Sequence, residues 1–177
     1  CIRDRSLMLK DLNVHILEAS KKYCRSGEAM GTTFTGILFV GDQYVIAHVG
    51  DTRVYQITSD MKQLTTDQTF VAREVSRGTM TLEQALQDKR RNILLQCVGA
   101  SDVVEPQVLT GKTVKGAYML CSDGFRHEIT EREMYESLNP INLMNKKAMH
   151  SNAKYLIEQV KSRQEKDNIS VVLIRAE

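Results

Sequence analysis

The sequence predicts an α+β fold in which helices pack in layers against β-sheet. Amphipathic helix patterns occupy residues 5–24 and 147–163, and the stretch between them contains short runs rich in Val, Ile and Tyr. The length of 177 residues suits one compact hydrophobic core. We therefore expect a single domain over residues 1–177.

The first third of the chain predicts one helix followed by three strands. The apolar stripe of the helix, spaced three and four residues apart, comprises Leu9, Leu12, Ile16, Ala19 and Tyr23. Ser26 and Gly27 then interrupt the pattern. β-rich runs follow at 33–40, 44–49 and 53–57, and tight Gly-Asp turns separate them. Three short strands joined in this way predict an antiparallel meander.

The rest of the chain alternates capped helices with strands. Residues 64–95 are polar and charged, and Thr81 with Gln84 forms a capping box that begins a short helix. Thr130 with Glu133 begins another helix in the same way. The stripe of the last helix comprises Ala153, Leu156, Ile157 and Val160. The remaining strands are expected at 103–109, 116–121 and 169–174.

Composition argues against several classes of partner. The 24 Lys and Arg residues nearly balance the 22 Asp and Glu residues, so neither nucleic acid nor a membrane is expected to bind. No apolar run approaches the roughly 20 residues that cross a bilayer. The four cysteines, beginning with Cys1, form no CxxC pair, which indicates a reducing, cytoplasmic location.

Three acidic residues stand where a predicted strand begins or ends. Asp51 follows Val49-Gly50, Asp123 follows an apolar strand, and Asp167 precedes another. An Asp at a turn is by itself an ordinary turn former. Carboxylates presented together at strand ends, however, are the ligands that hard divalent cations such as Mg²⁺ and Mn²⁺ prefer. The context of Asp123 and Asp167 favours a metal site.

An ordered series of motifs resembles the type 2C metal-dependent protein serine/threonine phosphatases, in their bacterial form. The series runs from residue 31 to the C-terminus and comprises Gly31-Thr32-Thr33, Val49-Gly50-Asp51-Thr52-Arg53, Arg91-Asn92-Ile93-Leu94 leading to Gly99, Cys121-Ser122-Asp123-Gly124-Phe125, and Asp167-Asn168-Ile169-Ser170. One such motif is weak evidence, whereas the ordered series is specific.

The resemblance implies an antiparallel β-sandwich flanked by helices, with two or three Mg²⁺ or Mn²⁺ ions. It implies that a metal-activated water hydrolyses phosphoserine and phosphothreonine in proteins, in signalling that opposes a serine/threonine kinase. By this likeness Asp123 and Asp167 are metal ligands, Asp51 helps to hold a third ion, and Gly124 and Asn168 support the site. Residues 71–88 resemble the family's flap.

The chain departs from the family pattern in two places. The early acidic residue, the phosphate-binding Arg and the Asp-Gly-rich segment of the family are absent, so we expect an N-terminally incomplete domain with little activity on its own. The alternatives are a non-catalytic phosphatase-like binding or regulatory module and, less favoured, a regulator phosphatase acting on an anti-sigma antagonist. His127 stands where relatives commonly carry Asp; it either tunes a third metal toward Mn²⁺ or lies on the surface.

Overall fold

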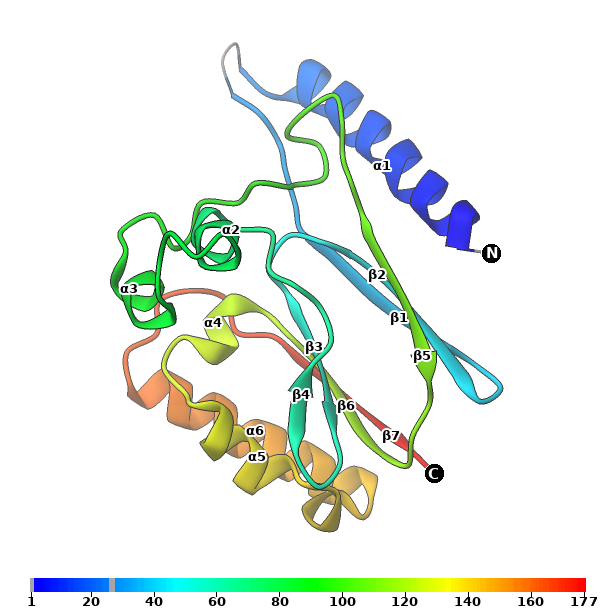
Figure 1. Ribbon diagram of the computed structural model, residues 1–177, viewed down its shortest axis with the longest axis vertical. Coiled ribbons are helices and arrows are strands. Elements are labelled where there is room, and N and C mark those ends of the chain that lie inside the picture. The colour runs from blue at the N-terminus through cyan, green and yellow to red at the C-terminus, as the bar shows by residue number, and fades with distance from the viewer. Residues whose placement is uncertain (1, 26–27) are drawn as a thin grey trace. The chain divides into compact units, whose positions relative to one another are not determined.

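The structure is a computed structural model that describes residues 2–25 and 28–177. Cys1, Ser26 and Gly27, which the sequence analysis singled out, lie outside the described residues. The chain divides into two compact units, and each contains its own β-sheet (Figure 1). Unit 1 comprises Cys1–Asp51 and Thr66–Gly111, and unit 2 comprises Thr52–Thr65 and Lys112–Glu177. The single domain over residues 1–177 stays a prediction.

Unit 1 combines a long helix with a three-stranded sheet. Helix α1 (Ile2–Tyr23) precedes β1 (Phe34–Val40) and β2 (Gln43–Val49), which pair as an antiparallel hairpin. Strand β5 (Gln107–Lys112) completes the sheet in the order β1-β2-β5. Leu9 of α1 is fully buried in one cluster with Val49. Leu9, Leu12 and Ile16 of the stripe therefore pack in this cluster as their spacing predicts, whereas Tyr23 at its end is 71% exposed.

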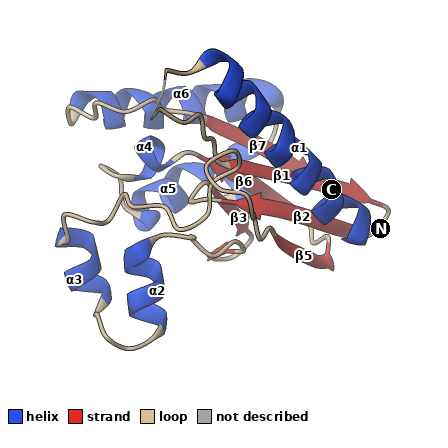
Figure 2. Ribbon diagram, turned by 90° about the horizontal axis from the view of Figure 1, so that it is seen from above, coloured by secondary structure: helices blue, strands red, loops and turns tan. Residues whose placement is uncertain are grey.

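The polar segment of unit 1 contains two short helices, whereas the sequence predicted one. They are α2 (Phe70–Ser76) and α3 (Leu82–Gln87), which lie side by side in Figure 2. Thr69 caps α2 by accepting a hydrogen bond from the main-chain N–H of Ala72. The capping box of α3 is confirmed, since Thr81 and Gln84 bond reciprocally. Sequence reasoning missed α2 because Thr69 is not followed by Glu or Gln three residues later.

Unit 2 contains a four-stranded antiparallel sheet in the order β4-β3-β6-β7. Its strands are β3 (Arg53–Ile57), β4 (Met61–Gln63), β6 (Gly116–Cys121) and β7 (Val171–Ala176). The predicted meander is wrong at its last step, because β3 pairs with β4 and β6 and not with β2. The chain leaves the first sheet at Gly50, whose φ of 111° is a left-handed conformation that favours glycine.

Helices of unit 2 pack on its sheet through one apolar cluster. Helix α4 (Asp123–Arg126) directly follows β6, and α5 (Glu131–Leu138), η1 (Pro140–Leu143) and α6 (Lys146–Ser162) come next. Leu138, Leu156 and Val160 are buried against Met119 of β6. The capping box of α5 is confirmed, with Thr130 and Glu133 as its partners. Among the described helices, none has the length and apolar character that spanning a membrane requires.

Candidate metal centre

Asp123 is the first residue of α4, at the point where β6 ends. Its Oδ1 accepts a hydrogen bond of 2.9 Å from the main-chain N–H of Gly124. The preceding residue, Ser122, donates its hydroxyl to the carbonyl oxygen of Asn168 at 3.1 Å and accepts the N–H of Ser170 at 3.0 Å. These bonds tie the end of β6 to the segment that leads into β7. The position of the Asp123 carboxylate is therefore fixed by two neighbouring strand ends.

Asp167 lies in that adjoining segment, between α6 and β7. Its Oδ1 accepts the N–H of Asn168 at 2.6 Å. A Cβ placed on Gly124 would stand only 2.6 Å from the carbonyl oxygen of Asn168 and 3.1 Å from Cβ of Asp167. No side chain larger than hydrogen fits there without movement. The structure thus brings the segments that carry Asp123 and Asp167 into close contact within unit 2.

The two carboxylates suit part of a site for a hard divalent cation. One oxygen of each is turned to a main-chain N–H of its own segment, and carboxylate oxygens are the ligands that Mg²⁺ and Mn²⁺ prefer. Among the described residues, however, no group of three or more His, Cys, Asp or Glu side chains is placed to hold a metal ion. Asp123 and Asp167 would by themselves supply only part of a coordination shell, and their role as metal ligands stays a prediction.

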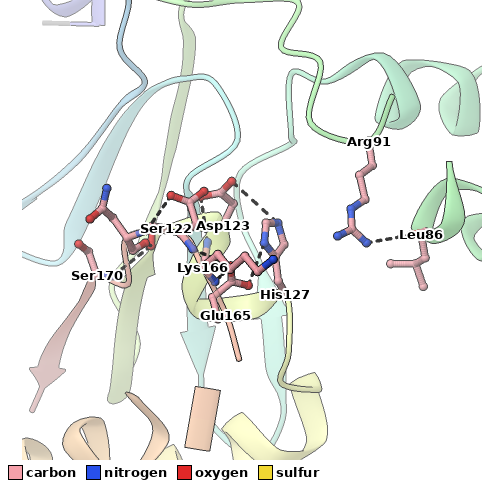
Figure 3. A network of polar contacts seen from close by, with 11 residues as sticks. Leu86, Arg91, Ser122, Asp123, His127, Glu165, Lys166 and Ser170 are labelled. Atoms are coloured by element: carbon pink, nitrogen blue, oxygen red, sulfur yellow. Dashed lines mark hydrogen bonds and ion pairs between the residues drawn. The ribbon is translucent and has the colours of Figure 1, made fainter. Parts of the chain in front are cut away.

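His127 is partly buried, and its side chain has charged neighbours on both ring nitrogens. It is the C-cap of α4, and its side chain is only 15% exposed. Nδ1 lies 3.3 Å from Oε2 of Glu165, and Nε2 lies 3.8 Å from Oδ2 of Asp123. Figure 3 shows the imidazole ring between the two carboxylates. His127 therefore belongs to the surroundings of Asp123, and its influence on a metal ion stays a prediction.

Glu165 is a member of this cluster that sequence reasoning missed. Its Oε1 accepts the main-chain N–H groups of Lys166 at 2.7 Å and Asp167 at 2.8 Å. Burial raises the pKa of Glu165, but these two amides and the neighbouring His127 outweigh it, and the net pKa lies below the usual range. Nothing in the polar run of residues 163–166 separates Glu165 from an ordinary solvated loop residue.

Asp51 belongs to unit 1, whereas Asp123 and Asp167 belong to unit 2. Gln68 holds the turn before Asp51 through two hydrogen bonds to Gly50. Its side-chain Oε1 accepts the main-chain N–H of Gly50 at 2.7 Å, and its main-chain N–H donates to the Gly50 carbonyl oxygen at 2.8 Å. Burial, followed by the negative charge of Asp51, raises the pKa of Cys97. The turn at Asp51 is therefore built by contacts inside unit 1, and its role as a metal ligand stays a prediction.

Known proteins that resemble the chain are bacterial phosphatases. The serine/threonine phosphatase stp of Listeria innocua is 34% identical over 147 residues, which are 82% of this chain and 56% of that protein. The serine/threonine phosphatase of S. agalactiae superposes with a TM-score of 0.86 at 29% identity, over 99% of this chain and 71% of that one. The catalytic domain of the phosphatase PstP, solved with two manganese ions, superposes with a TM-score of 0.75 at 29% identity, over 91% of this chain and 65% of that one. No family model matches the chain.

These likenesses agree with the observed fold. In sequence and in fold the chain is similar to these bacterial serine/threonine phosphatases, and it shares with them a mixed fold of helices and antiparallel sheets. It spans about half the length of the curated relative from Listeria, at 56%.

Proposed function

We propose that the protein hydrolyses phosphoserine and phosphothreonine in other proteins, with Mg²⁺ or Mn²⁺ as its cofactor. The observation that carries the proposal is the close contact between the segments of Asp123 and Asp167 at the ends of β6 and β7. Support comes from relatives named as serine/threonine phosphatases and from a relative solved with two manganese ions.

In the proposed reaction Asp123 and Asp167 hold divalent cations through their carboxylate oxygens. When bound, such ions lower the pKa of a coordinated water and neutralise charge on the phosphoryl oxygens. The chain's own residues keep the two carboxylates in place, with Gly124 permitting the close approach and Asn168 joining the two segments. No covalent intermediate on Ser122 or Cys121 is required.

Two carboxylates do not by themselves complete the coordination shell of a divalent cation. Asp123 and Asp167 leave the shell incomplete, and no third carboxylate or imidazole in the described part of the chain joins them as a ready ligand set. The family likeness assigns Asp51 to a further, weaker ion. The 177 residues alone are therefore expected to have little activity. In the cell we place the protein in the cytoplasm, where it opposes a serine/threonine kinase.

The test is Mn²⁺-dependent hydrolysis of a phosphothreonine peptide by the full-length protein. Asp123→Asn and Asp167→Asn keep the side-chain size but remove the charge, and each is expected to lower kcat/KM at least about 100-fold. Asp60→Asn, a change in the turn between β3 and β4, is the matched control and should retain full activity.

Two results would decide against catalysis. Full activity in both site variants would show that Asp123 and Asp167 are not the metal ligands. Absence of both activity and Mn²⁺ binding in the unmodified full-length protein would favour the alternative, a phosphatase-like module that binds a partner without hydrolysis.

A further inference from the structure

Glu165 divides its two carboxylate oxygens between two neighbours of the candidate metal centre. Oε1 accepts the main-chain N–H groups of Lys166 and Asp167, at 2.7 and 2.8 Å. Oε2 lies 3.3 Å from Nδ1 of His127. With a side chain that is 9% exposed, Glu165 is the more buried member of this pair. A carboxylate with so little exposure usually has partners for its oxygens, and here Oε1 has two and Oε2 has one.

The first arm of Glu165 shapes the segment that carries Asp167. Helix α6 ends at Ser162, and Gln164 adopts a left-handed φ of 66°, which turns the chain toward β7. Directly after this turn, Oε1 of Glu165 gathers two successive main-chain N–H groups that no strand or helix satisfies. The Asp167 amide is one of them. This bond constrains the main chain at Asp167, and with it the direction in which the Asp167 side chain points.

The second arm reaches Asp123 through the imidazole of His127. Because Nδ1 faces Glu165, the opposite ring nitrogen, Nε2, faces Oδ2 of Asp123 at 3.8 Å. Oδ1 of Asp123 is already held by the N–H of Gly124. Each oxygen of the Asp123 carboxylate thus has a neighbour: the main-chain amide of Gly124 for Oδ1 and the ring of His127, which contacts Glu165, for Oδ2 (Figure 3). Carboxylate–histidine pairs of this kind commonly orient the groups that bind metals.

We propose that Glu165 is a positioning residue that orients both metal-binding carboxylates, Asp167 through its main-chain amide and Asp123 through His127. The proposal rests on the proposed function for the statement that Asp123 and Asp167 bind metal. It assigns no metal contact to Glu165 itself. It states that one largely buried side chain couples two ligands that are 44 positions apart in the sequence.

The first experiment uses the metal-free full-length protein and follows hydrogen exchange at the amides of residues 166–167. Glu165→Ala removes the acceptor and should speed exchange there at least about tenfold, the factor that corresponds to losing roughly 1.4 kcal/mol of protection. Glu165→Gln retains a side-chain oxygen and should restore the slow exchange. Glu158→Gln, an exposed residue of α6, is the control. Unchanged exchange in Glu165→Ala would overturn the first arm.

The second experiment measures Mn²⁺ affinity by titration calorimetry. Glu165→Ala should weaken Mn²⁺ binding about 10- to 100-fold, as loss of an orienting carboxylate generally does. His127→Ala should weaken it less, since it removes one arm only. The double variant should match Glu165→Ala within about twofold, because the single change already disables both arms. Additive losses, or wild-type affinity in Glu165→Ala, would overturn the proposal.

Failure of the proposed function has a different signature. In that case the unmodified protein binds no Mn²⁺ at all, while hydrogen exchange still shows whether Glu165 holds the Asp167 segment.

Discussion

Substitution of Gly124 by alanine tests how closely the two segments of the metal centre must approach. The added Cβ would stand 2.6 Å from the carbonyl oxygen of Asn168, whereas carbon and oxygen atoms in close contact are normally about 3.3–3.6 Å apart. The segment of Asp167 must therefore retreat by roughly 0.7 Å or more. Overpacking of this kind costs about 1–3 kcal/mol of the free energy of unfolding. A shift near 1 Å in a reacting site costs about 100-fold in rate.

The assay for Gly124→Ala has a stability arm and a metal arm. Urea unfolding of the metal-free full-length protein gives the free energy of unfolding, and calorimetric titration gives the Mn²⁺ affinity. Gly36→Ala is the matched control, because its Cβ would meet only the ring of Phe34 at 3.4 Å, an ordinary contact distance. The control should change the free energy of unfolding by less than about 1 kcal/mol and leave Mn²⁺ affinity unchanged. Equal behaviour of the two variants would refute the close-approach argument.

Three further predictions concern the framework around the site. Burial lowers the pKa of His48 below its ordinary value of 6.5, so the folded state takes up a proton less readily than the unfolded state. The free energy of unfolding should therefore be full above about pH 6.5 and should fall as the pH drops below it. Urea unfolding at pH 7.5 and 5.5 should show a smaller fall in the variant His48→Gln than in the unmodified protein. Gly50→Ala places a Cβ 2.4 Å from Cγ2 of Thr33 at a φ of 111°, and a loss above about 2 kcal/mol is expected by urea unfolding, with a loss under about 0.5 kcal/mol contradicting the account. Thr130→Ala removes the N-cap of α5 and should lower the free energy of unfolding by about 1 kcal/mol, whereas no change would mean that the capping box contributes nothing.

Local patterns predicted most elements because the signals for those elements are local. The capping boxes at Thr81 and Thr130 fixed the starts of two helices, and both are confirmed. The pairing of strands is a long-range property, and the switch of the chain to a second sheet after Gly50 could not be derived from spacing. Tyr23 shows the same limit: it continues the apolar stripe of α1 but is 71% exposed. Periodicity does not reveal where the covering element stops.

The candidate site divides in the same way. Asp123 and Asp167 could be predicted because each stands beside an apolar strand, and the structure brings their segments into contact. Glu165 could not, since its burial depends on the turn at Gln164 and on the ring of His127. Gln68 is a similar case: its two hydrogen bonds to Gly50 depend on a contact across 18 positions. Polar residues that support a site in this way have no distinguishing pattern along the chain.

The most direct test of the central claim is a crystal structure of the full-length protein grown with Mn²⁺, with anomalous diffraction used to locate the manganese. The account predicts anomalous peaks at the ends of β6 and β7, with carboxylate oxygens of both Asp123 and Asp167 about 2.0–2.3 Å from manganese. Peaks elsewhere, or peaks that neither carboxylate contacts, would contradict it.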